Sequence, residues 1–91
     1  MTFDMFQEYI EEHILEGWKS DVELDVAMVT KNNGVQLRGL YIKSKEMNVS
    51  PAIYLDEYYS YYLKGESLEE IIRRIREEYE WKISRVADYH F

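Results

Sequence analysis

The residues best suited to chemistry are few, and the one group with metal-ligand character lies near the N-terminus. His13 directly follows Glu12 and precedes Glu16 by three positions. Imidazole and carboxylate groups are ligands for zinc and manganese. On a helix these side chains lie close together, but three ligands from a single helix converge poorly on one ion. They form a weak candidate metal site, and a partly buried histidine beside helical glutamates is the simpler interpretation.

No catalytic constellation accompanies this group. The sequence has no cysteine, which excludes disulfides, thiolate catalysis and cysteine-ligated metals. Asp56 and Glu57 are adjacent carboxylates, but helix capping accounts for Asp56 without chemistry. No glycine-rich phosphate loop, nucleophile elbow or histidine metal motif is present. We therefore predict a non-enzymatic protein with no catalytic residues and no cofactor.

A cluster of tyrosines is the most unusual feature of the chain. Four of its nine tyrosines fall within the five positions 58–62. At about 100° per residue, the apolar arc of this segment spans about 200°, wider than the roughly 100° stripe that a surface helix buries. Part of the arc is expected to form a core wall, with the remainder facing a partner protein. The candidate interaction surface comprises Tyr58, Tyr59, Tyr61 and Tyr62, with Val86 and Tyr89 from the apolar stripe of the last helix.

The arginines bear on nucleic acid as a partner. The sequence has 11 basic and 18 acidic residues, a net charge of −7. Arg73 has a glutamate four residues away on each side, Glu69 and Glu77. Arg74 is flanked in the same way by Glu70 and Glu78. This spacing predicts a solvated face of ion pairs. Such a surface repels phosphate backbones and anionic lipids, which argues against nucleic acid and membranes as partners.

The first expected element is an amphipathic helix over residues 3–18. Its apolar positions recur every three or four residues, with glutamates between them. Thr2 is the expected N-cap, and Gly17 is the expected end.

A β-hairpin should follow, because two segments of alternating pattern, Asp21 to Val29 and Val35 to Lys43, flank the turn sequence "KNNG". Asn33 and Gly34 both tolerate positive φ, which favours an even-numbered loop of two or four residues. A two-residue loop pairs Val26 with Tyr41 and places Gly39 on the core face, where a helix approaches closely or the strand bulges. A three-residue loop would instead bring Asp25 to the core face.

The second half of the chain predicts a short strand and two helices. "VSPAIYL" is expected to form a strand. Because of Pro51, this strand either lies at an edge of the sheet or begins its pairing after the proline. Asp56 is expected to cap the tyrosine helix and Gly65 to end it. Ser67 and Glu70 form a capping box that opens the last helix. Its apolar spacing continues to the C-terminus, although an alternating pattern also permits a strand over residues 81–91.

These elements predict a single small α+β domain over residues 1–91. Its order is α-β-β-β-α-α, with a three-stranded antiparallel sheet packed by helices and the last ten or so residues as a helical extension. The N-terminus lacks the pattern of a secretory signal, and no stretch reaches the ~20 apolar residues of a membrane span. We expect a soluble, cytoplasmic protein.

Four ordered motifs resemble a bacterial family known as domain of unknown function 5688. They are "KNNGV" (31–35), "LRGLYI" (37–42), "SPAIYL" (50–55) and "YLKGESLEEI" (62–71), and the likeness covers roughly residues 3 to 80. Members of that family often extend further, which makes this chain a short member or a fragment. The resemblance implies a bacterial, cytoplasmic setting and supplies neither an activity nor site residues.

The leading functional hypothesis is a protein-interaction module or homodimer that uses the tyrosine-rich surface. An RNA-associated module is the first alternative, because double-stranded RNA-binding domains share the order α-β-β-β-α, although the net charge opposes it. A small-ligand or metal-binding domain around Glu12, His13 and Glu16 is the second.

Overall fold

The computed structural model of the chain describes residues 1–18, 21–45 and 50–90, with side chains as far as Arg85. Three helices and three strands follow the order α1 (Phe3–His13), β1 (Val22–Thr30), β2 (Gln36–Ser44), β3 (Ala52–Tyr54), α2 (Leu55–Leu63) and α3 (Leu68–His90). The strands form one antiparallel sheet in the order β1-β2-β3. The predicted α+β class and element order are confirmed, and residues 81–90 are helical. In the described residues, no helix is long and apolar enough to cross a bilayer.

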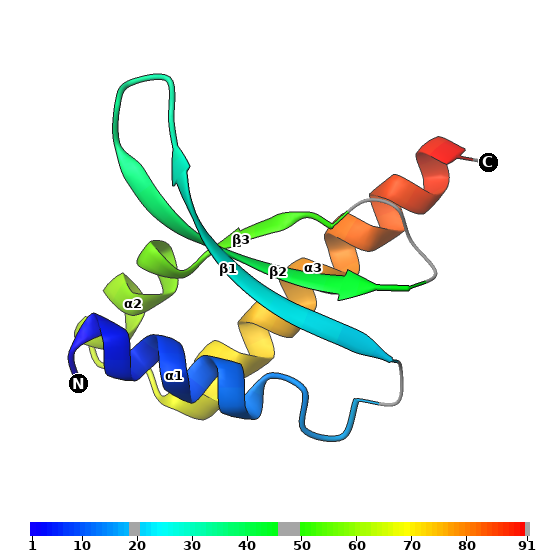
Figure 1. Ribbon diagram of the computed structural model, residues 1–91. Helices are drawn as coiled ribbons and strands as arrows, with labels where there is room; N and C mark the ends of the chain where they lie inside the picture. Colours follow the sequence, from blue (N-terminus) through cyan, green and yellow to red (C-terminus); the bar gives the residue numbers. More distant parts are fainter. Residues whose placement is uncertain (19–20, 46–49, 91) are drawn as a thin grey trace.

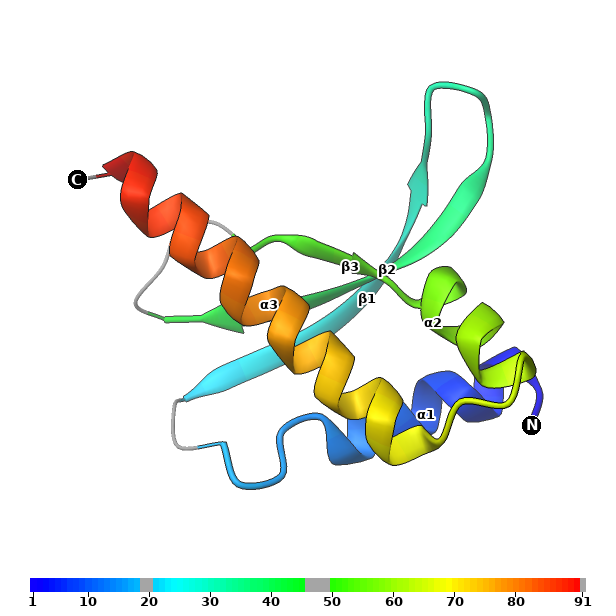
Figure 2. The same ribbon diagram turned by 180° about the vertical axis from the view of Figure 1, so that it is seen from behind.

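The helices pack on one face of the sheet. α3 runs behind the sheet in Figure 1 and in front of it in Figure 2, and α1 and α2 lie together at the N-terminal end of α3. The core between helices and sheet contains these buried side chains: Phe6, Ile10, Ile14, Leu40, Ile42, Ile53, Leu55, Tyr58, Ile71, Ile75 and Tyr79. Burial of these apolar groups is the main force that holds the fold together.

The first helix is shorter than predicted. Thr2 is its N-cap, as expected, since its hydroxyl accepts a hydrogen bond from the Met5 N–H at 3.2 Å. The helix ends at His13 rather than Gly17, and the chain continues in tight turns with Gly17 at φ 73°. These turns bring Ile14 into the core and pack Trp18 against its edge, with the Trp18 ring centroid 5.4 Å from that of Tyr79.

The prediction of an even-numbered hairpin loop is wrong. The loop has three residues, Asn32 to Gly34, flanked by a backbone hydrogen bond from Lys31 N–H to the Val35 carbonyl. Gly34 alone adopts positive φ (83°) and donates to the Lys31 carbonyl at 2.9 Å, the geometry of a type I turn with a G1 bulge. An Asn33 side chain that accepts from Val35 N–H favours this turn.

The odd-numbered loop changes the core face of β2. Val26 pairs with Leu40, and Asp25 with Tyr41. Leu40 and Ile42 are therefore buried, whereas Asp25 remains on the outer face, contrary to our expectation for a three-residue loop. Gly39 also lies on the outer face. The side chains of Val29 and Tyr41 cover it, at 3.1 and 3.2 Å from the position of a Cβ. Neither a helix approach nor a bulge explains this glycine.

The start of α2 also differs from the prediction. Tyr54 is the N-cap residue, with no capping side chain, and Asp56 lies inside the first turn. The Asp56 carboxylate instead accepts a hydrogen bond of 2.7 Å from the Arg38 N–H on β2. Because β3 ends at Tyr54, this carboxylate takes the place of the next strand residue as the acceptor for β2.

The turn between α2 and α3 follows the sequence signals. Gly65 has φ 105° just after the end of α2, as predicted. The Ser67 hydroxyl accepts from Glu70 N–H at 3.2 Å, which is half of the predicted capping box. The Glu70 carboxylate binds Arg73 rather than the backbone of Ser67.

Candidate functional site

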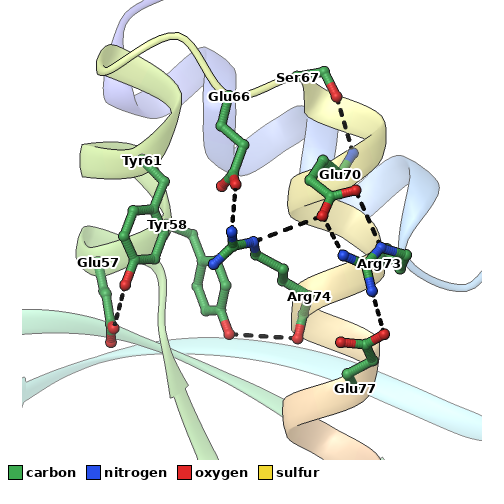
Figure 3. A network of polar contacts seen from close by, with 9 residues as sticks. All are labelled: Glu57, Tyr58, Tyr61, Glu66, Ser67, Glu70, Arg73, Arg74 and Glu77. Atoms are coloured by element: carbon green, nitrogen blue, oxygen red, sulfur yellow. Dashed lines mark hydrogen bonds and ion pairs between the residues drawn. The ribbon is translucent and has the colours of Figure 1, made fainter.

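A cleft between α2 and α3 is the candidate functional site. Its volume is about 490 Å³, and it is open to solvent. The side chains that line it are aromatic or charged: Tyr58, Tyr61 and Trp81, with Glu57, Arg74, Glu77 and Glu78. α2 supplies one wall and α3 the other, because the turn at Gly65 folds the two helices against each other (Figure 3).

Tyr58 forms the buried floor of the cleft. Only 5% of its surface is exposed, and its hydroxyl donates to Glu78 Oε1 at 2.6 Å. Burial raises the pKa of the Tyr58 phenol well above its ordinary value near 10, and the hydrogen bond to the Glu78 carboxylate raises it further. The phenol therefore stays protonated in the folded protein at pH values where free tyrosine ionises.

An alkaline titration should reveal this tyrosine. Because the pKa of Tyr58 is raised in the native state, its contribution to stability is complete below pH ~10 and is lost above it, where the unfolded chain ionises first. The Tyr58→Phe variant should lose about 1–2 kcal/mol of unfolding free energy at pH 8. It should then show a shallower decline in stability between pH ~10 and ~11.5. Urea unfolding of both proteins across this range is the measurement, and equal slopes would contradict the assignment.

Arg74 and its partners form the upper end of the cleft (Figure 3). Its guanidinium is 2.7 Å from Glu66 and 3.9 Å from Glu70, and it lies over the Tyr61 ring at 5.3 Å. The Tyr61 hydroxyl in turn donates to Glu57 at 3.1 Å, and this hydrogen bond raises the pKa of Tyr61. The charge of Arg74 is thus compensated within the chain.

Arg73 is compensated in the same way, by Glu70 and Glu77. The prediction of an ion-paired arginine face is therefore confirmed. Arg73–Glu77 and Arg74–Glu70 have the predicted spacing of four residues, whereas Arg73–Glu70 and Arg74–Glu66 do not. Phosphate contacts by Arg73 or Arg74 would have to replace these ion pairs.

The tyrosine cluster is divided between two surfaces. Tyr58 and Tyr61 line the cleft, whereas Tyr59 and Tyr62 pack against α1. The Tyr59 ring stacks on Phe3 with centroids 4.7 Å apart, and its hydroxyl donates to the Met1 carbonyl. Both Tyr59 and Tyr62 are half-buried, so their contact with a partner remains a prediction.

Two further members of the predicted interaction surface, Val86 and Tyr89, belong to α3. Their side chains lie outside the described part of the structure.

The candidate metal ligands lie on the opposite side of α3 from the cleft. His13 Nδ1 is 2.5 Å from Glu16 Oε1, and the His13 ring packs against Tyr9 with centroids 4.2 Å apart. These residues border a second depression, of about 450 Å³, that also contains Arg76. Within the residues that the structure describes, no three histidine or carboxylate groups gather closely enough to hold a metal ion.

Sequence reasoning missed three residues that shape these sites. The Arg76 guanidinium donates to the carbonyls of His13, Ile14 and Glu16 at the end of α1, at 2.7 to 3.3 Å. The Lys82 ammonium donates to the Ala52 carbonyl at 2.7 Å and pairs with Glu78. Trp81 lines the cleft and is 57% exposed. Trp81 and Lys82 left a signal in the sequence, because Trp81 falls outside the apolar stripe of its helix and Lys82 interrupts that stripe.

Comparison with known protein families identifies a family for the chain. The sequence profile described as "Family of unknown function (DUF5688)" matches residues 3–90. No curated protein and no solved structure matches the chain.

Proposed function

We propose that this chain, which belongs to the DUF5688 family of unknown function, is a non-enzymatic protein-interaction module. The cleft between α2 and α3 would hold a basic segment of a partner protein. The observation that carries the proposal is Trp81, a large aromatic side chain left 57% exposed beside a cleft whose rim is mainly carboxylate. The setting we propose is the bacterial cytoplasm, as the family resemblance implies.

The aromatic rings of the cleft suit a cationic side chain. Tryptophan and tyrosine faces attract guanidinium and ammonium groups within about 6 Å of the ring centroid. The chain itself uses both rings in this way, since Arg74 lies over Tyr61 and Arg85 lies 4.8 Å from the centroid of the Trp81 ring. An arginine from a partner could stack on the remaining exposed surface of Trp81.

The charges around the cleft favour the same guest. The charged side chains that line the cleft are three carboxylates, Glu57, Glu77 and Glu78, and one guanidinium, Arg74. Arg85 adds a second guanidinium beside Trp81. Among the described residues, Glu57 accepts a hydrogen bond from a neutral phenol, whereas Glu77 and Glu78 pair with cations. The charge of Glu57 is therefore the least compensated. Carboxylates at the rim of an interface speed association and select basic partners.

Binding of a short arginine-rich peptide tests this proposal. Changing both Glu57 and Glu77 to glutamine removes two charges at the rim, and should weaken binding about tenfold. Trp81→Ala should weaken it by a similar factor. Titration of backbone amide NMR signals would give the affinity, and the perturbed residues should belong to α2 and α3.

The matched control changes Glu8 and Glu12, two exposed glutamates of α1, to glutamine. This variant has the same net charge as the cleft variant. It should bind the peptide within about twofold of the parent protein. Equal weakening by both double variants would mean that the peptide responds only to the net charge of −7, and the proposal would be abandoned.

A further inference from the structure

The two edges of the sheet differ in how they are protected. β3 spans only Ala52–Tyr54, follows a proline, and has its Ala52 carbonyl bound by Lys82 from α3. Short strands, proline and lysine are common protections of a sheet edge. β1 at the other edge is nine residues long and, in the described part of the chain, pairs with β2 alone.

The hairpin geometry identifies the backbone groups at this open edge of β1. The Lys31 N–H donates to the Val35 carbonyl at 2.8 Å, so this pair is hydrogen-bonded. Because hydrogen-bonded and non-hydrogen-bonded pairs alternate along an antiparallel ladder, the odd-numbered residues of β1 bond to β2. The even-numbered residues Leu24, Val26, Met28 and Thr30 therefore direct their N–H and C=O groups outward.

The apolar side chains of β1 show that the core is also incomplete at this edge. Leu24 and Val26 are half-buried, whereas Ile42 and Leu40, directly opposite on β2, are 0% exposed. Met28 on the same face is 58% exposed. The loop end of the hairpin extends beyond the helices (Figure 1). A further strand beside β1 would cover all three side chains.

We propose that this strand is β1 of a second copy, in antiparallel pairing about a twofold axis at Ala27. This inference is independent of the α2–α3 cleft. In this register Val26 lies opposite Met28 of the second copy, and the outward-facing groups of Leu24 to Thr30 pair with one another. Backbone hydrogen bonds would continue the sheet across the axis, as in other strand-addition interfaces.

The charged residues of β1 favour this register over those whose axis lies closer to Asp25. It places Glu23 opposite Lys31 of the second copy and Asp25 opposite Val29. A shift of the axis to Asp25 would set two Asp25 carboxylates directly opposite each other, which is destabilising. An axis at Val26 would leave the same carboxylates as diagonal neighbours. The interface is small, so association in the micromolar to millimolar range is expected.

Molar mass in solution, measured by sedimentation equilibrium across this concentration range, is the first test. The mass should rise from 11.1 kDa towards twice that value. Met28→Lys should weaken association at least about tenfold, because lysine at a strand edge opposes pairing. Met5→Lys is the matched control, since Met5 is an exposed methionine on α1 and the change in charge is identical. It should leave the association within about twofold of the parent.

A disulfide cross-link tests the register, because the parent chain has no cysteine. Ala27→Cys places two thiols at a non-hydrogen-bonded pair across the axis, where the Cα separation of about 4.5 Å permits a disulfide. Oxidation should yield a covalent dimer from Ala27→Cys and little from Asp25→Cys. A mass of 11.1 kDa at all concentrations, or equal effects of the two lysine variants, would overturn the dimer. Preferred cross-linking through position 25 would overturn the register.

Discussion

Leu40→Ala is expected to lower the unfolding free energy by about 2–5 kcal/mol, a large share of the roughly 5–15 kcal/mol available to a small domain. Leu40 is 0% exposed and lies at the centre of the sheet, between Val26 of β1 and Ile53 of β3. Its removal leaves a cavity against the helices that the surrounding core can only partly fill. Urea or thermal unfolding followed by circular dichroism would measure the loss.

Tyr41→Ala is the control for this prediction, because Tyr41 is the next residue on the same strand but points to the outer face. Its ring covers Gly39 and is half-buried, so its loss should cost about 1 kcal/mol. An even-numbered loop would place Tyr41 on the core face. That register predicts a larger loss of stability from Tyr41→Ala than from Leu40→Ala. A larger loss from Tyr41→Ala than from Leu40→Ala would therefore contradict the observed pairing.

Arg76→Ala should produce the second large effect, a loss of about 2–3 kcal/mol. The Arg76 side chain binds three carbonyl groups at and just beyond the C-terminal end of α1, where helix geometry leaves carbonyls without helical partners. A cation at this end is also favoured by the helix dipole. For a domain of this size the melting temperature should fall by about 10–20 °C.

Arg73→Ala is the informative control, since Arg73 binds two glutamates but is exposed on α3. Exposed ion pairs contribute only about 0–1 kcal/mol, because water screens the charges and both side chains lose freedom. We expect Arg76→Lys to fall between the two, because an ammonium group cannot reach three carbonyls in the manner of a planar guanidinium. Similar losses from Arg73→Ala and Arg76→Ala would show that Arg76 does not fasten α1 to α3.

Local signals in the sequence were sufficient for the order and type of the elements. Thr2, Gly65 and Ser67 act through groups within a few residues of themselves, and helix or strand periodicity depends only on which face is apolar. These are short-range properties, so they were predicted correctly. The long stripe from Leu68 likewise indicated that the last helix continues into residues 81–90.

The hairpin register was decided by tertiary packing. Asn33-Gly34 suits several turns, and both faces of β2 contain apolar residues. The packing of the helices decides which face of β2 is buried. Leu40 and Ile42 fill the space against the helices, while the larger Tyr41 ring remains on the open face over Gly39. The same argument applies to Asp56, whose partner, Arg38 N–H, lies on a strand 18 positions earlier.

The candidate site was predicted in part. The sequence identified a tyrosine-rich helix with more apolar surface than one core buries, but not which ring would face which neighbour. That division arises because α1 packs on Tyr59 and Tyr62 while α3 packs on Tyr58 and Tyr61. Arg76 and Lys82 bind backbone carbonyls that are 60 and 30 positions away in the sequence. A backbone carbonyl has no residue type, so contacts of this kind leave no pattern in a sequence, and only the folded chain brings the partners together.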